Sequence, residues 1–170
     1  MIKQDTLEKQ VKIAYLSIGS NLGNRFLNIE KAKSLLLDEG IRIVKSSSYY
    51  ETLSWPNPKN PKFYNIVLKT KTRLSEIKIL KICKQIEKLL GRKKNQRNSP
   101  RECDIDIIDY NGKTQKIDIC LPHPRMHTRN FVLIPMYEID KSWIHPITQE
   151  HIKTLIFSLS NRDIRSIKQI

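Results

Sequence analysis

The apolar residues of the chain switch repeatedly between the period of a strand and the period of a helix. Stretches rich in β-branched and aromatic residues predict four strands, at residues 13–18, 41–52, 63–70 and 100–108. Two helix patterns lie between them and end at Gly40 and Gly91, where glycine permits a left-handed C-terminal stop. The predicted order is therefore strand, helix, strand, strand, helix, strand.

That order is the split β-α-β arrangement of ferredoxin-like sheets. Farther along the chain, Asn111-Gly112 is a strong hairpin signal and predicts a returning strand over residues 117–121. Apolar residues then recur at helical spacing over residues 132–139 and 148–160. We expect an α+β fold, a ferredoxin-like βαββαβ sandwich with an added β-hairpin and C-terminal helices.

The chain has 170 residues and no Gly/Ser-rich linker, which predicts a single domain over residues 12–170. Residues 1–11 are largely polar and are expected to form a flexible N-terminal extension. No stretch approaches the length of a membrane span, and the three cysteines show neither a disulfide framework nor zinc-site spacing. These features predict a cytoplasmic protein. The net charge of +14 comes from lysines scattered along the chain, so it does not select a partner.

Asp104 and Asp106 lie two residues apart in the strand predicted over residues 100–108. Because side chains alternate between the faces of a strand, both carboxylates should project from one face. Neighbouring carboxylates repel each other, so they need open water, as at a solvated strand edge, or a cation such as Mg²⁺. Positively charged side chains nearby favour the metal, because they suit the phosphate oxygens of a nucleotide that would bind with Mg²⁺. These cations are Arg92, Lys93, Lys94, Arg97 and Arg101.

Three other polar residues have two interpretations each. Asn65 interrupts the strand over residues 63–70, either at a solvated position or as a partner for the edge of a heterocycle. His123 lies in a proline-flanked segment and is either a structural histidine or a ligand contact. Glu87 borders the apolar face of the second helix, where a solvated flank is expected.

Several short motifs together resemble the family of 6-hydroxymethyl-7,8-dihydropterin pyrophosphokinases, enzymes of folate biosynthesis. The resemblance runs from about Ile13 to about Ile156. The motifs are Gly19-Ser-Asn-Leu, Tyr50-x-Thr52, Phe63-Tyr64-Asn65, Ile86-Glu87-x-x-Leu90-Gly91-Arg92, Arg97-x-x-Pro100-Arg101-x-x-Asp104-Ile-Asp106-Ile-Ile, and Leu121-Pro-His-Pro-Arg125 with Arg129-x-Phe131-Val-Leu.

The resemblance implies transfer of a pyrophosphoryl group from ATP to the hydroxymethyl group of a reduced pterin, with AMP as the other product. It implies that Asp104 and Asp106 ligate two Mg²⁺ ions and that, with Arg92 and Arg101, they form the catalytic set. The implied ATP-binding residues are Arg92, Lys94, Arg101, His123 and Arg129. The implied pterin-binding residues are Thr52, Phe63, Asn65 and Phe131.

We expect a monomer that acts on small molecules and binds neither nucleic acid nor membrane. Two other classes of function stay open beside this expectation. A ferredoxin-like module with this charge could bind RNA, although its strands lack the Gly-Phe-x-Phe pattern that stacks bases. A metal-dependent nuclease could use two acids beside arginines, although no third or fourth carboxylate is spaced to complete an obvious two-metal site.

Overall fold

Within residues 10–93 and 98–170, the part of the chain that this computed structural model describes, six strands form one antiparallel sheet. The strands are β1 (Lys12–Ser20), β2 (Arg42–Ser46), β3 (Tyr50–Thr52), β4 (Phe63–Thr72), β5 (Asp104–Tyr110) and β6 (Lys168–Gln169). The order is β5-β1-β4-β3-β6, and β2 pairs with the far end of β4. The predicted α+β, ferredoxin-like arrangement is confirmed. The predicted extension over residues 1–11 falls almost wholly outside the described residues.

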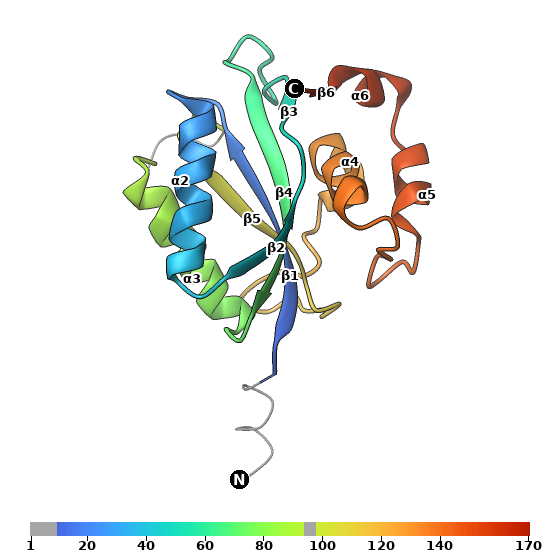
Figure 1. The fold of residues 1–170 in the computed structure, drawn as a ribbon. Coiled ribbons are helices and arrows are strands. Elements are labelled where there is room, and N and C mark those ends of the chain that lie inside the picture. The colour runs from blue at the N-terminus through green and yellow to red at the C-terminus, as the bar shows by residue number, and fades with distance from the viewer. Residues whose placement is uncertain (1–9, 94–97) are drawn as a thin grey trace.

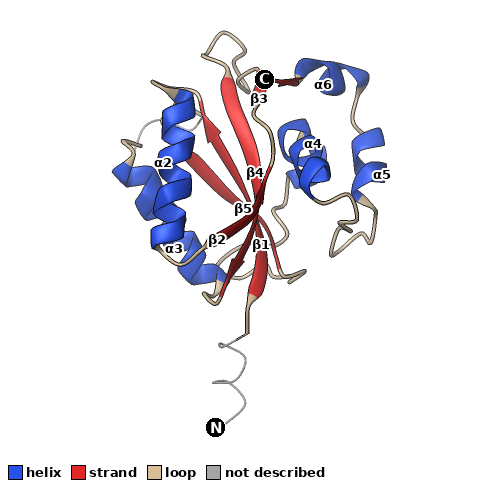
Figure 2. Ribbon diagram, viewed as in Figure 1, coloured by secondary structure: helices blue, strands red, loops and turns tan. Residues whose placement is uncertain are grey.

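Helices cover both faces of the sheet, which makes three layers (Figure 1). One face carries α2 (Arg25–Asp38) and α3 (Glu76–Leu89), and the other carries α4 (Asn130–Ile139) and α5 (Ile152–Phe157). The short helix η1 (Met126–Thr128) contacts α4 and α5, and the short helix α6 (Asn161–Ser166) lies on the same side of the sheet as these two helices (Figure 2). No helix in the described ranges is long and apolar enough to cross a membrane.

Alternation along the strands produces two hydrophobic cores. Leu16 and Ile66 face α2 and α3, whereas Val67 and Ile108 face α4 and α5. Because side chains alternate with a period of two, one strand supplies both cores, and burial of both faces gives most of the stabilisation. The helices leave part of one face open near the strand ends, where Ser17 and Asp106 line a cavity, so a ligand site can form there.

The two predicted helices between the strands form where expected. Asn24 caps α2 by accepting a hydrogen bond from the Leu27 N–H, and Ser75 caps α3 by accepting from the Lys78 N–H. Gly40 follows α2 with φ of 79°, a backbone conformation that glycine adopts without steric cost. The strands predicted over residues 13–18 and 63–70 also form and extend by a few residues as β1 and β4.

The prediction of one continuous strand over residues 41–52 is wrong, because β2 and β3 are separate. Between them, Ser47 Oγ accepts the Val67 N–H at 2.9 Å, and the Ser47 N–H donates to the Val67 carbonyl at 2.9 Å. A serine hydroxyl thus replaces one backbone acceptor of the ladder and bends the chain.

The strand predicted over residues 117–121 is also absent from this described segment. The turn at Asn111-Gly112 forms, with φ of 52° and 68°, but the chain that follows makes only one isolated bridge, between Gln115 and Leu121. Asp118 has φ of 63°, and the Ile119 N–H bonds the Ile117 carbonyl, which is a tight turn inside the expected strand. The helix predicted over residues 148–160 is shorter, and neither α6 nor β6 was expected.

Candidate functional site

The ends of three strands, β1, β4 and β5, lie together at one end of the sheet and form the floor of a cavity of about 910 Å³. In the sheet register Gly19 of β1 lies opposite Asp104 of β5 on one side and Asn65 of β4 on the other. The cavity walls are the loop after β3, the segment before β5, the loop between β5 and α4, and α6. Rigid strand backbone thereby fixes two cavity-lining side chains from β4, Phe63 and Asn65, and two from β5, Asp104 and Asp106.

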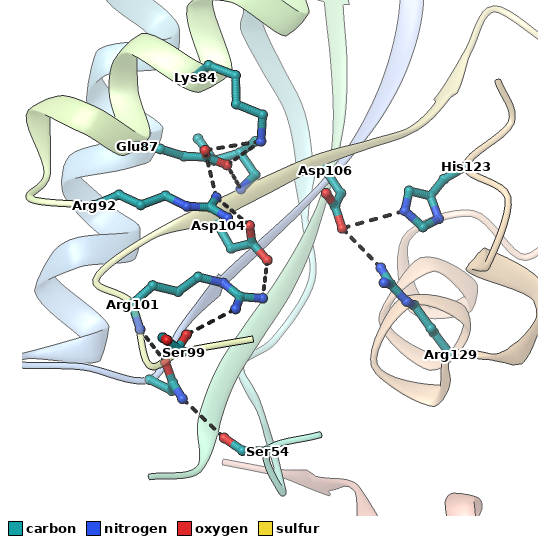
Figure 3. Close-up of polar contacts among 12 residues, drawn as sticks. Ser54, Lys84, Glu87, Arg92, Ser99, Arg101, Asp104, Asp106, His123 and Arg129 are labelled. Atoms are coloured by element: carbon teal, nitrogen blue, oxygen red, sulfur yellow. Dashed lines mark hydrogen bonds and ion pairs between the residues drawn. The ribbon is translucent and has the colours of Figure 1, made fainter. Parts of the chain in front are cut away.

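Asp104 is held between two arginines (Figure 3). Arg92 Nη1 lies 2.7 Å from Asp104 Oδ1, and Arg101 Nη2 lies 2.6 Å from Asp104 Oδ2. Burial opposes ionisation of this carboxyl group, but the charges of Arg101 and Arg92 outweigh it and lower the pKa of Asp104. The carboxylate is therefore charged and paired at both oxygens.

Asp106 projects from the same face of β5 as Asp104 and points toward His123 and Arg129 (Figure 3). Arg129 Nη1 lies 3.0 Å from Asp106 Oδ2, and His123 Nε2 lies 3.7 Å from the same oxygen. Burial lowers the pKa of His123, and neighbouring guanidinium groups add to this, although Asp106 opposes it. The imidazole is consequently expected to be neutral at neutral pH and available for a hydrogen bond.

Glu87 corrects the sequence interpretation of a solvated flank, because this residue is only 2% exposed. Its Oε1 accepts the backbone N–H of Ile105 at 2.8 Å, and its Oε2 lies 2.7 Å from Arg92 Nη1. Lys84 Nζ completes the carboxylate's contacts at 2.8 Å. Since Ile105 separates the two aspartates, Glu87 joins α3 to the strand that carries both of them and holds Arg92 beside it.

Asn21, at the end of β1, connects two loops of the cavity. Its Nδ2 donates to Ser54 Oγ and to the Pro61 carbonyl, each at 3.1 Å. Its Oδ1 accepts the backbone N–H of Arg101 at 2.8 Å. A single buried amide therefore ties the loop after β3 to the segment that bears Arg101.

The cavity also carries an amide and two aromatic rings, and the guanidinium groups of Arg101 and Arg129 lie 5.1 and 5.4 Å from the ring centroids of Phe63 and Phe131. Asn65 is buried, and its Nδ2 donates to Thr52 Oγ1 at 2.9 Å. Phe63 and Phe131 line the cavity from β4 and α4. Gly19 leaves space for the amide, since a Cβ at this position would lie 2.9 Å from Asn65 Oδ1. These groups offer aromatic rings and a carboxamide, which together suit a flat, polar heterocycle.

One cavity thus contains all but one of the predicted site residues. They are Thr52, Phe63, Asn65, Arg92, Arg101, Asp104, Asp106, His123, Arg129 and Phe131. Lys94 lies outside the described residues. The sequence motifs assigned no role to Asn21, and the expectation that Glu87 is solvated was wrong. The partners of both side chains include backbone groups distant in sequence, which motifs do not reveal. Arg125 and Arg162 also line the cavity and were not predicted as site residues.

The two aspartates offer the hard oxygen donors that Mg²⁺ prefers, and they project into the cavity from one strand face. Among the described residues no group of three or more His, Cys, Asp or Glu side chains gathers as a ligand set. Ions held here would need further oxygen ligands from a bound molecule or water, as is usual for Mg²⁺ bound with phosphates. The donor set therefore fits Mg²⁺ in company with a polyphosphate.

Comparison with known proteins gives consistent matches. Residues 15–141 match the model of the family described as 7,8-dihydro-6-hydroxymethylpterin-pyrophosphokinase. The chain is 39% identical to the 2-amino-4-hydroxy-6-hydroxymethyldihydropteridine pyrophosphokinase of Aquifex aeolicus, over 82% of this chain and 87% of that protein. It is 37% identical to the folic acid synthesis protein fol1 of Schizosaccharomyces pombe, over 91% of this chain.

The match to fol1 spans only 21% of the length of that protein, so this chain corresponds to about a fifth of it. A solved structure of Plasmodium falciparum HPPK-DHPS with pterin and p-hydroxybenzoate resembles the fold with a TM-score of 0.72 at 16% identity. That match covers 95% of this chain and 48% of the other. At this identity the structural likeness bears on the fold.

Proposed function

This chain belongs to the 7,8-dihydro-6-hydroxymethylpterin-pyrophosphokinase family, and we propose that it transfers pyrophosphate from ATP to 6-hydroxymethyl-7,8-dihydropterin. The products are AMP and the pterin diphosphate, an intermediate of folate biosynthesis. One observation carries the proposal: a single cavity brings paired aspartates and arginines together with an amide and two aromatic rings. Such a cavity can hold a polyphosphate and a heterocycle together.

For the phosphates, Arg92, Arg101 and Arg129 present planar donors suited to phosphate oxygens. His123 adds a neutral ring beside Arg129. Transfer of a phosphoryl-type group asks the protein mainly for alignment and charge neutralisation rather than for a nucleophile. The guanidinium groups meet that need by stabilising the charge that develops between the α- and β-phosphates.

Asp104 and Asp106 would hold two Mg²⁺ ions together with ATP oxygens. Bound there, the ions would neutralise phosphate charge and polarise the acceptor hydroxyl group. Glu87 would position both aspartates, because it binds the backbone N–H between them.

For the heterocycle, Phe63 and Phe131 would stack on the two faces of the pterin. Asn65, oriented by its bond to Thr52, would read the polar edge of the ring. The floor formed by β1, β4 and β5 would align the hydroxymethyl group with the phosphates, since residues on adjacent strands are fixed by the sheet register.

The alternatives gain no support from these observations. An RNA-binding sheet needs an open face for stacked bases, and helices pack against both faces here. A two-metal nuclease would need more carboxylates than Asp104 and Asp106 offer among the described residues. The predictions of a monomer and of a cytoplasmic location are tested by neither the fold nor the relatives, and they stay predictions.

The proposed function is tested by incubating the protein with ATP, Mg²⁺ and 6-hydroxymethyl-7,8-dihydropterin and identifying both products by phosphorus NMR. AMP with a pterin diphosphate in equal amounts is expected. ADP with a pterin monophosphate would contradict the proposal, because it would mean transfer of one phosphoryl group.

A further inference from the structure

Two arginines of the cavity already have a carboxylate partner, and that partner is a proposed metal ligand. Arg92 and Arg101 bind the two oxygens of Asp104 at 2.7 and 2.6 Å. The carboxylate that should hold a divalent cation and the guanidinium groups that should hold phosphate therefore neutralise each other when neither ligand is present.

Arg101 is not fully satisfied in this arrangement. Its Nη2 binds Asp104 and its Nη1 donates to the Ser99 carbonyl at 3.2 Å, but its Nε is buried without a hydrogen-bond partner. A buried donor without an acceptor destabilises the state that contains it. This orphaned donor indicates a second arrangement, in which a bound acceptor takes the Nε hydrogen.

Arg92 has a second anchor that does not depend on Asp104. Glu87 Oε2 lies 2.7 Å from Arg92 Nη1, and Glu87 is itself fixed by the backbone N–H of Ile105. Arg92 can leave Asp104 and still keep a charged partner. This lowers the cost of moving the guanidinium group toward a phosphate, because no buried charge is left alone.

We propose that Arg92 and Arg101 are exchangeable counter-ions of Asp104. Without nucleotide they occupy the carboxylate and keep divalent cations away from it. With nucleotide they transfer to phosphate oxygens, and Asp104 becomes free to ligate the cation. The proposal rests on the proposed function, since it assigns the phosphates to ATP.

Two consequences follow. The nucleotide-free protein should bind a free divalent cation weakly, and cation and nucleotide should strengthen each other's binding by the same factor. Removing an arginine should therefore have opposite effects on the two ligands. It should weaken the nucleotide, which loses a phosphate contact, and strengthen the free cation, which no longer competes for Asp104.

Electron paramagnetic resonance of Mn²⁺ measures cation binding without any need for turnover. We expect Arg101→Ala to bind Mn²⁺ in the absence of nucleotide about fivefold or more tightly than the unaltered protein, the lower end of usual coupling between sites. Arg125→Ala removes the same charge from the same cavity, but no described residue pairs with the Arg125 side chain. It should change Mn²⁺ affinity by less than about twofold, because surface charges without a partner act weakly.

The same titration with α,β-methylene-ATP, which cannot be cleaved between its α- and β-phosphates, completes the test. The unaltered protein should gain Mn²⁺ affinity by about 5- to 150-fold, and Arg101→Ala should gain less. Equal or weaker Mn²⁺ binding by Arg101→Ala without nucleotide would overturn the exchange, as would equal strengthening by Arg125→Ala. If either result overturns the exchange, Mn²⁺ binding that nucleotide still strengthens would leave the proposed function standing. If no Mn²⁺ binds under any condition, both the exchange and the proposed function are overturned.

Discussion

Asn21 and Arg101 hold each other by two hydrogen bonds. The Asn21 backbone N–H donates to the Arg101 carbonyl at 3.1 Å, and the Arg101 N–H donates to Asn21 Oδ1 at 2.8 Å. The Asn21 side chain also binds Ser54 and Pro61. The end of β1 therefore fixes the segment before β5 relative to the loop after β3, and both line the site.

Asn21→Ala should lower both stability and activity. The substitution leaves the Arg101 N–H without an acceptor, although the Pro61 carbonyl keeps its hydrogen bond from Ser54 Oγ, and it should reduce the free energy of unfolding by about 1–3 kcal/mol. Urea denaturation measures that loss, and steady-state turnover should show a larger fall in kcat/KM than stability alone explains. The matched control is Asn57→Ala, which removes an exposed asparagine side chain from the loop after β3. Native kcat/KM in a folded Asn21→Ala protein would contradict the positioning role.

Phe131→Ala should weaken pterin binding more than ATP binding. The ring supplies stacking worth about 0.5–1.5 kcal/mol beyond its buried area, so pterin affinity should fall by about tenfold. Isothermal titration with each ligand separates the two effects. Phe157→Ala removes an exposed ring from α5 and should change neither affinity. A greater loss of ATP affinity than of pterin affinity in Phe131→Ala would reverse the assignment.

Asp140 makes stability depend on pH at the acid end. Burial opposes its ionisation, but hydrogen bonds from Lys69 and Tyr15 lower its pKa to about 2. A carboxyl group with a lower pKa in the folded state stabilises the fold above its unfolded pKa, about 3.9. That contribution, about 2 kcal/mol, is lost as the pH falls from about 4 to about 2.

Asp140→Asn should therefore flatten the pH dependence of the unfolding free energy between pH of about 4 and about 2. Urea midpoints at several pH values measure the slope. Asp38→Asn, at the exposed end of α2, controls for the change in net charge. An unchanged slope in Asp140→Asn would show that the Lys69 pair contributes nothing to acid stability.

Local patterns predict the parts of this fold that depend on neighbours in sequence. The periods of β1, β4, α2 and α3 follow from their own residues, and the caps at Asn24 and Ser75 can be read directly. The shared face of Asp104 and Asp106 follows from the same rule of alternation.

Other features depend on distant partners and escape such a prediction. Glu87 has the composition of a solvated flank, and only the folded chain places the Ile105 N–H and Arg92 against it. The split between β2 and β3 depends on the Ser47 hydroxyl reaching Val67. Likewise, two residues of β6 have no pattern of their own and form a strand because β3 offers an unpaired edge.

The pairing of Asp104 with Arg92 and Arg101 is a further case. Motifs place these residues in one site, but they do not indicate that both arginines pair with the carboxylate of Asp104. That arrangement follows from burial, since charges removed from water need a partner.

The most direct test of the whole account is AMP formation by Asp104→Asn, with ATP, Mg²⁺ and 6-hydroxymethyl-7,8-dihydropterin supplied. The substitution removes a charged metal ligand and keeps the shape of the side chain, and even residues that only support metal ligands are worth 10- to 100-fold. We predict that turnover falls by more than about 100-fold while circular dichroism shows a folded protein. Asp118→Asn, an exposed control that tolerates its positive φ, should keep native turnover. Near-native AMP formation by folded Asp104→Asn would contradict the central claim that this carboxylate holds the metal for pyrophosphoryl transfer.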